Sequence, residues 1–150
     1  MKQLFTTLGH MVCVLTCIFM LSSLSVHAQY KWNRLTAPTS RNGMHAIAIS
    51  KDGQYVVAAG MYKSIIESRD SGVTFQDISL GNVGDLWSVA FFSAQGTVAV
   101  GDDGEVYRRE TFNGEWTMQI IASGATLNSV EYVGANTLLI GAATGDVFRS

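Results

Sequence analysis

The sequence of 150 residues has few charged residues, few cysteines and no excess of positive charge. Charged residues make up 15% of the chain, and the formal net charge is −2. Without a basic excess, a nucleic-acid ligand is not expected. Both cysteines, Cys13 and Cys17, lie near the N-terminus, so a chain cleaved after residue 28 contains no disulfide. His45 is then the only histidine, which excludes a site built from two histidines in this segment.

The first 28 residues have the pattern of a secretory signal peptide. Lys2 precedes the apolar run LGHMVCVLTCIFML, and the segment ends in Val26-His27-Ala28, a small-residue cleavage pattern. A transmembrane anchor is the alternative, but the run barely reaches the roughly 20 residues that span a bilayer, and no positive cluster follows it. We therefore expect cleavage after Ala28, a mature chain without a membrane span, and a secreted or periplasmic location.

The rest of the chain contains an internal repeat with offsets of 42 and 41 residues. Three units superimpose, and they begin at His45, Trp87 and Asn128. Glycine recurs at equivalent positions, Gly60, Gly101 and Gly141. An aromatic residue precedes each unit, at Trp32, Phe75 and Trp116. Because self-similarity at a fixed period indicates a repeat architecture, these three units are expected to fold alike.

Each period contains four short apolar runs separated by turn signals, and no stretch after Ala28 has a helical period. The first run of each unit, MHAIAIS, LWSVAFF or LNSVEYV, is almost entirely apolar or small, which predicts an innermost strand covered on both faces. Four-stranded units of about 40 to 45 residues are typical of β-propeller blades. We therefore predict an all-β propeller of four-stranded antiparallel blades, with about 2.75 blades present.

The repeat also predicts the domain organisation. After the signal peptide, residues 29–150 form a partial propeller, with an outer closing strand and linker at 29–43, blades at 44–85 and 86–126, and an incomplete blade at 127–150. Trp32 lies where an N-terminal strand that completes the last blade is expected. Such a chain exposes an apolar blade face and unpaired strand edges. We expect it to be the N-terminal part of a longer protein; association of chains to complete the ring is the alternative.

Residues 68–75, SRDSGVTF, lie in the outer turn between the predicted third and fourth strands. They resemble the Asp box of the BNR-repeat propellers, Ser/Thr-x-Asp-x-Gly-x-Thr-Trp/Phe, at Ser68, Asp70, Gly72, Thr74 and Phe75. In this turn Asp70 can accept backbone hydrogen bonds, Gly72 supplies a conformation costly for other residues, and Phe75 can fold between sheets. The second unit keeps only the aromatic residue, with Arg109, Thr111, Asn113, Glu115 and Trp116 at these positions.

The resemblance implies an architectural role for the box and leaves two functions open. The family includes sialidases, sortilin-type receptors, xyloglucan hydrolases and photosystem II assembly factors. We expect a non-catalytic binding or scaffold module for a protein or glycan, without a cofactor, because these residues contain no convergent catalytic set. The alternative is a secreted glycoside hydrolase, sialidase-like or xyloglucanase-like, with catalytic residues largely beyond residue 150. A WD40-type propeller shares the period, but no Trp-Asp pair ends the third strands.

Few acidic or basic residues are candidates for catalysis or metal binding. Glycoside hydrolysis needs two carboxyl groups about 5 to 9.5 Å apart, but Asp52, Asp85 and Asp103 all lie in predicted turns. Residues 102–105, DDGE, lack the spacing of an EF-hand, so we expect a hairpin turn and no metal site. No catalytic residue is assigned.

Three aromatic residues of the inner strands are the candidate ligand-facing positions. His45 and Trp87 are equivalent, and Tyr132 lies four residues after Asn128, so strand alternation predicts that the three share one face. In a closed ring this face would line a channel, where aromatic rings bind sugars by stacking. Packing between blades is the alternative.

Overall fold

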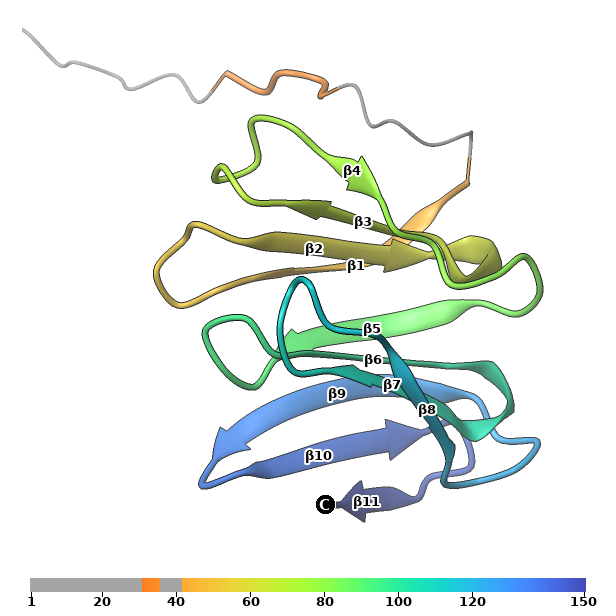
Figure 1. Ribbon diagram of the computed structural model, residues 1–150. Coiled ribbons are helices and arrows are strands. Elements are labelled where there is room, and N and C mark those ends of the chain that lie inside the picture. The colour runs from red at the N-terminus through yellow and green to blue at the C-terminus, as the bar shows by residue number, and fades with distance from the viewer. Residues whose placement is uncertain (1–30, 36–41) are drawn as a thin grey trace, which may run out of the picture. The chain divides into compact units, whose positions relative to one another are not determined.

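The strands form three antiparallel sheets that lie side by side (Figure 1). The computed structural model describes residues 31–35 and 42–150, and Leu35–Ser150 form one compact unit. Residues 31–35 form no strand, and the predicted signal peptide and most of the linker lie outside the described residues. Among those described, no helix has the length and apolar character needed to cross a membrane.

Two sheets have four strands and the third has three. The first contains β1 (Met44–Ile49), β2 (Val56–Gly60), β3 (Ile65–Ser68) and β4 (Gln76–Asp77). The second contains β5 (Leu86–Phe91), β6 (Thr97–Gly101), β7 (Glu105–Arg109) and β8 (Thr117–Ile120). The third contains β9 (Leu127–Gly134), β10 (Thr137–Ala142) and β11 (Val147–Arg149). The predicted all-β fold of antiparallel four-stranded units is confirmed.

Apolar side chains fill the two spaces between the sheets. The cluster between the first and second sheets includes Val57, Ile65 and Leu86, and the cluster between the second and third includes Val100 and Val130. Burial of these β-branched and leucine side chains, at about 25 cal/mol per Å² of apolar surface, is the main force that holds the sheets together. The second sheet is therefore packed on both faces.

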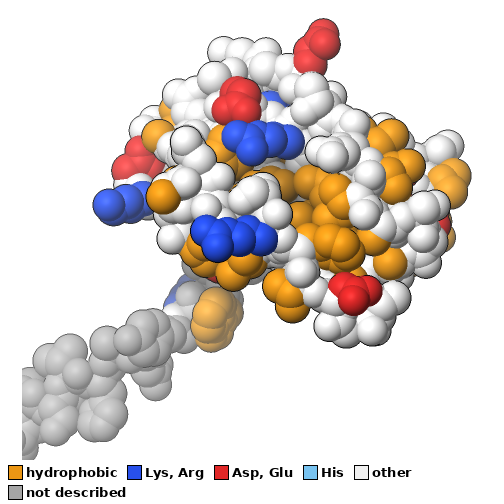
Figure 2. All heavy atoms as spheres, turned by 90° about the horizontal axis from the view of Figure 1, so that it is seen from below, with side chains coloured by type: hydrophobic (Ala, Val, Ile, Leu, Met, Phe, Trp, Pro, Cys, Tyr) orange, Lys and Arg blue, Asp and Glu red, His pale blue; other side chains and the backbone are white. Residues whose placement is uncertain are grey.

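The two outer sheets each leave one face open. Ile47 of β1 is 65% exposed and Val133 of β9 is 54% exposed. Apolar side chains also gather on the surface seen from the side of the third sheet (Figure 2). The expectation that every innermost strand is covered on both faces is therefore correct for β5 and wrong for β1 and β9, because those two sheets have a neighbour on one side only.

The recurring glycines lie where the second strand approaches the chain entering the first strand. A Cβ atom on Gly60 would clash with the backbone of Gly43, and one on Gly101 would clash with the carbonyl group of Asp85. In the third sheet a Cβ atom on Gly141 would meet only the hydroxyl of Ser129, 2.8 Å away. Close backbone approach thus accounts for glycine in the first two units.

Candidate functional site

A stacked pair of aromatic rings joins the beginnings of two innermost strands. The rings of His45 in β1 and Trp87 in β5 lie 4.3 Å apart between centroids, with an angle of 11° between their planes. His45 is exposed, and Trp87 is 38% exposed. Aromatic rings that are rigid and partly exposed are enriched in protein-binding surfaces. This pair, here called the His45–Trp87 pair, is the candidate binding site.

Backbone and carboxylate groups fix the orientation of both rings. The Nδ1 atom of His45 lies 3.2 Å from the carbonyl oxygen of Leu86. Because a carbonyl oxygen only accepts, Nδ1 carries the proton of this bond, and in the neutral ring Nε2 is an acceptor. Trp87 donates its Nε1–H to Oδ1 of Asp102 at 2.8 Å. The pair therefore lies in a fixed geometry before any ligand binds.

Asp102 connects this pair to the loop that enters β5. Its Oδ2 atom accepts the backbone N–H of Asp85 at 2.9 Å, while Oδ1 also accepts the Thr126 hydroxyl at 3.4 Å. Asp85 in turn accepts the backbone N–H of Tyr62 at 3.0 Å. Each carboxylate therefore links two segments that are far apart in sequence, which holds this end of the sheets together.

The tight turns between the second and third strands of the first two sheets contain three residues other than glycine with positive φ angles. Tyr62 and Lys63 have φ of 55°, and Asp103 has φ of 57°. This left-handed region is uncommon for residues other than glycine, asparagine and aspartate, and strained residues cluster at functional sites. Tyr62 is also an exposed large side chain. The turns thus present Tyr62 and Asp103 at the end of the sheets where Asp85 and Asp102 lie.

Tyr132 does not join the His45–Trp87 pair. It packs against the apolar cluster between the second and third sheets. Each innermost strand contains a β-bulge: the partners of β9 on β10 skip Asn128, just as the partners of β1 and β5 skip His45 and Trp87. A ligand-facing role for His45, Trp87 and Tyr132 stays a prediction.

The Asp-box residues form one hydrogen-bonded turn. Oδ1 of Asp70 accepts the hydroxyl of Ser68 at 2.7 Å and the backbone N–H of Thr74 at 2.8 Å, and Oδ2 accepts the Thr74 hydroxyl at 2.6 Å. The bonds from Thr74 and then that from Ser68 lower the pKa of Asp70 to about 2. Gly72 has φ of 86°, the left-handed conformation expected of it.

Phe75, the aromatic residue of the box, covers the open face of the first sheet. It lines a hollow of about 410 Å³ together with His45, Ala58 and Ile66. Its equivalent Trp116 instead packs between the first and second sheets. Phe75 and Trp116 thus lie on the same face of their own sheets. A neighbouring sheet covers this face for Trp116 and leaves it open for Phe75.

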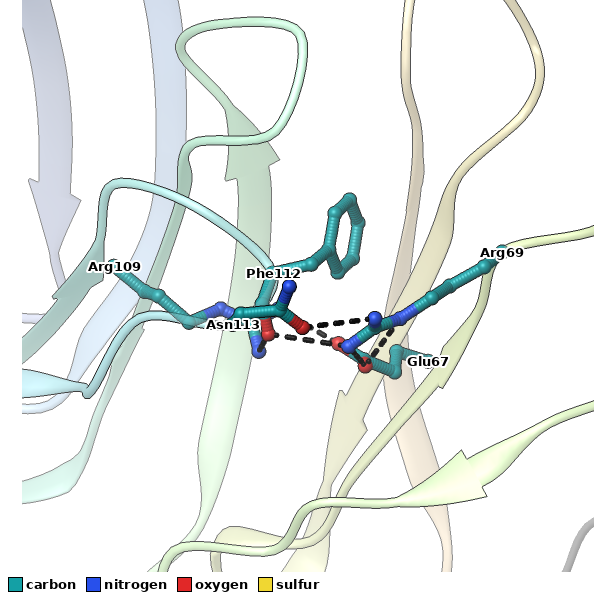
Figure 3. A network of polar contacts seen from close by, with 5 residues as sticks. All are labelled: Glu67, Arg69, Arg109, Phe112 and Asn113. Carbon is teal, nitrogen blue, oxygen red and sulfur yellow. Dashed lines mark hydrogen bonds and ion pairs between the residues drawn. The ribbon is translucent and has the colours of Figure 1, made fainter.

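A buried ion-pair network replaces the box in the second sheet (Figure 3). Arg109 donates to Oε2 of Glu67 across the sheet interface at 2.8 Å, and Arg69 donates to Oε1 at 2.7 Å. Both arginines also donate to the carbonyl oxygen of Phe112. Sequence reasoning missed this network. The sequence feature that indicates it is Glu67, an acidic residue in the apolar third strand of the first unit, with Arg109 at nearly the same place in the second unit.

The other acidic candidates lie in separate turns. Asp52 accepts the Ser50 hydroxyl at 2.6 Å, and this bond, with a further one from the backbone of Gln54, lowers its pKa. Asp85 bonds to Tyr62, whereas Asp103 is exposed. In residues 31–35 and 42–150, no group of three or more metal-binding side chains comes together.

Arg108 and Arg109 are adjacent in β7 but make different contacts. Arg108 pairs with Glu110 at 2.9 Å and lies over the ring of Phe92, 4.1 Å from its centroid. Arg109 points in the opposite direction, into the interface with the first sheet. Arg108 and Arg109 therefore do not converge on one point.

Comparison with known proteins identifies the fold. No protein-family model and no curated protein matches the chain. The solved structures that resemble it include YCF48 bound to a D1 peptide (TM-score 0.71, 16% identity, 81% of this chain and 42% of that one), YCF48 from Cyanidioschyzon merolae (0.70, 16%, 80% and 40%), and the Cps50 (Swd1) β-propeller domain of Myceliophteria thermophila (0.54, 9%, 72% and 41%). The chain thus spans about two fifths of the length of each of these structures.

These likenesses define the class of protein as a β-propeller. The three sheets are blades arranged side by side, and the described residues do not close a ring. YCF48 and Cps50 resemble the chain in fold at low sequence identity, so they establish the architecture.

Proposed function

We propose that the chain is part of an exported Asp-box β-propeller that acts as a non-catalytic binding module for another protein. The complete match at Ser68, Asp70, Gly72, Thr74 and Phe75, together with its place between β3 and β4, supports the Asp-box assignment. The signal-peptide pattern of the first 28 residues supports export. One similar solved structure is described as bound to a peptide, which supports a protein as the ligand class.

The observation that carries this proposal is the fixed geometry of the His45–Trp87 pair. The two rings stack at 4.3 Å, and Asp102 holds the indole N–H. Because the pair is fixed before binding, a partner does not have to overcome the entropy cost of ordering these side chains. Tryptophan side chains that become buried on binding carry a large share of the binding energy at protein interfaces.

The same site is poorly suited to hydrolysis. Both oxygens of Asp102 accept hydrogen bonds from Trp87 and Asp85, and Asp85 accepts one from Tyr62. A general acid needs a carboxyl group that is free to give a proton to a leaving group. Asp85 and Asp102 instead serve as fixed acceptors, which favours binding over catalysis.

The test compares partner capture by three forms of residues 29–150: wild type, Trp87→Ala and Val73→Ala. Each is immobilised in equal amount and exposed to exported proteins of the source cells, and captured proteins are quantified by mass spectrometry. Val73 is an exposed apolar residue in the Asp-box turn, so its replacement is a control for non-specific hydrophobic binding. We expect a partner that is captured in equal amounts by wild type and by Val73→Ala. Trp87→Ala is expected to capture at least about tenfold less of it. Equal capture by all three forms contradicts the proposal.

A hydrolase control uses the same preparations. Fluorogenic sialosides and xyloglucan oligosaccharides are incubated with wild type and with Asp102→Asn. The proposal predicts no turnover above that of buffer by either form. Turnover by wild type that is lost in Asp102→Asn would show a glycoside hydrolase instead.

A further inference from the structure

The two ends of the sheets differ in charge. At the end that holds the His45–Trp87 pair lie residues 61–63, 81–87, 102–105, 122–128 and 143–146, which connect or begin strands. They include five acidic residues, Asp85, Asp102, Asp103, Glu105 and Asp146, and one basic residue, Lys63. The turns at the opposite end, residues 50–55, 68–75, 92–97, 108–117 and 134–137, contain four residues of each sign. Negative charge is therefore concentrated beside the candidate site.

Hydrogen bonds gather these acidic segments at one end of the sheets. In every sheet the turn after the second strand is bonded to the segment that enters the first strand (Figure 1). The backbone N–H groups of Met61, Asp102 and Ala143 donate to the carbonyl groups of Gly43, Asp85 and Thr126, respectively, at 2.8 to 3.0 Å. The side chains of Asp85 and Asp102 also accept bonds from neighbouring sheets. The acidic residues of the different sheets therefore lie at the same end.

The basic residue at this end is already paired. The Nζ atom of Lys63 lies 2.8 Å from Oε2 of Glu105, and both side chains are mostly buried. Lys63 therefore neutralises Glu105. Among the residues that the structure describes, Asp85, Asp102 and Asp103 form no ion pair. These three carboxylates thus leave uncompensated negative charge near Trp87.

Trp87 presents part of its ring at this end. His45 stacks on one face of the indole, yet Trp87 remains 38% exposed. Its strand, β5, contacts the innermost strands of both neighbouring sheets. A cation within about 6 Å of an aromatic ring centroid is attracted to the ring face, and tryptophan attracts it most strongly. The ring and the carboxylates therefore favour a ligand of the same charge.

Each innermost strand places one side chain at this end. The β-bulges skip His45, Trp87 and Asn128, and all three residues are exposed. Bulges re-aim side chains and are over-represented next to active sites. Because β5 lies between β1 and β9, Trp87 is the central one of the three. The site thus has an indole at its centre and no lysine or arginine at these three positions.

We propose that the partner of the His45–Trp87 pair presents a positively charged segment, with an arginine side chain against the exposed part of Trp87 and beside Asp103. This inference rests on the binding role proposed above and adds the chemical class of the partner. A guanidinium group can stack on an aromatic ring and donate hydrogen bonds to a carboxylate. Asp103 suits the second contact because it is exposed and follows Asp102, which holds the indole N–H.

Partners of other chemistry fit this end less well. An acidic segment is repelled by Asp85, Asp102 and Asp103. An apolar segment removes these carboxylates from water without giving them a partner, which costs free energy. Positive charge on the partner instead compensates the carboxylates and accelerates association. Charge complementarity therefore selects a basic segment.

Fluorescence anisotropy with labelled peptides tests this charge preference. Residues 29–150, which contain the whole compact unit Leu35–Ser150, are titrated into a peptide of alternating glycine and arginine and into its glycine–glutamate counterpart. We expect the arginine peptide to bind and the glutamate peptide not to bind. Raising the salt concentration from about 50 to 300 mM should weaken the binding, because salt screens exposed charges.

Substitutions at the two ends of the sheets locate the binding. Asp103→Asn should raise the Kd of the arginine peptide about twofold or more, and Trp87→Ala about threefold or more, with the fold checked by circular dichroism. Glu115→Gln is the matched control and should leave the Kd unchanged, because Glu115 is exposed in the turn before β8, at the opposite end. The proposal is overturned if the arginine peptide does not bind or if the two peptides bind equally. Equal effects of Asp103→Asn and Glu115→Gln overturn it as well.

The partner-capture experiment separates failure of this inference from failure of the binding role. A captured partner that depends on Trp87, but is unaffected by Asp103→Asn and by salt, leaves the binding role standing and contradicts a basic partner. Equal capture by wild type, Trp87→Ala and Val73→Ala contradicts the binding role itself.

Discussion

Glu67 of the first sheet and Arg109 of the second form a 2.8 Å ion pair in which both side chains are almost completely buried, at 1% and 3% exposure. Arg109 also lies over the rings of Phe112 and Trp116, 4.9 and 4.7 Å from their centroids. The pair joins two blades at the position where an Asp box would begin in the second one. It therefore replaces a local turn network with a contact between sheets.

Glu67→Gln is expected to destabilise the fold strongly. The change leaves the guanidinium of Arg109 buried without a countercharge, and loss of one partner from a buried pair costs about 3 to 5 kcal/mol. Urea unfolding followed by circular dichroism measures the free energy of unfolding.

Arg69→Ala is the matched control for this substitution. Arg69 contacts the same carboxylate at 2.7 Å, but its side chain is 43% exposed. Water screens such a pair, so its loss costs about 1 kcal/mol or less. Equal losses in Glu67→Gln and Arg69→Ala would show that burial does not govern the strength of this network.

Asp102→Asn is expected to lower the free energy of unfolding by about 1 to 2 kcal/mol. Both carboxylate oxygens accept N–H groups, from Trp87 and Asp85, and an asparagine amide would turn its own N–H toward one of them. The neighbouring Asp103→Asn is the control, because Asp103 is exposed and its φ of 57° suits asparagine. Thermal melting of both variants gives the comparison; a loss in Asp103→Asn as large as that in Asp102→Asn counts against the assigned contacts.

The Asp-box turn is expected to lose stability at low pH. The pKa of Asp70 is lowered from 3.8 to about 2, so its ionised form is favoured by folding. The contribution is fully present above pH 4 and disappears as the pH falls toward 2. The melting temperature of wild type should exceed that of Asp70→Asn at pH 6, and the difference should shrink between pH 4 and 2. A difference that does not change across this range is incompatible with the turn network.

Gly101→Ala is expected to be more harmful than Gly141→Ala, although the two glycines are equivalent in the repeat. The new Cβ atom at residue 101 meets the backbone carbonyl of Asp85, whereas at residue 141 it meets only the movable hydroxyl of Ser129. Overpacking against fixed atoms costs about 1 to 3 kcal/mol. Denaturant midpoints of the two variants measure the difference, and equal midpoints would mean that the approach to Asp85 relaxes.

The fold could be predicted from the sequence because the same features occur in all three units. The glycines at 60, 101 and 141 and the apolar runs before them recur at nearly constant spacing. A strand that is ambiguous in one unit can therefore be assigned from the equivalent segments of the other two. The strand pairs β1 with β2 and β5 with β6 lie where these runs were predicted to form strands. Local hydrophobic pattern and turn chemistry were sufficient for this level of structure.

The candidate site was only partly predictable. The equivalence of His45 and Trp87 indicated a shared location, and the two rings stack. Tyr132 packs against the apolar cluster between the second and third sheets, and strand alternation alone does not give the neighbours of its side chain. The pairing of Glu67 with Arg109 depended on how adjacent sheets face each other, and a pattern within one strand carries no such information.

The most direct test of the binding account is photo-crosslinking from the candidate site itself. A photoreactive phenylalanine analogue replaces Trp87 in one form and Val73 in another, and both are expressed in the source cells and irradiated. The account predicts a discrete protein adduct at position 87 and none at position 73. No adduct at position 87, or the same adducts at both positions, would contradict a binding role for the His45–Trp87 pair.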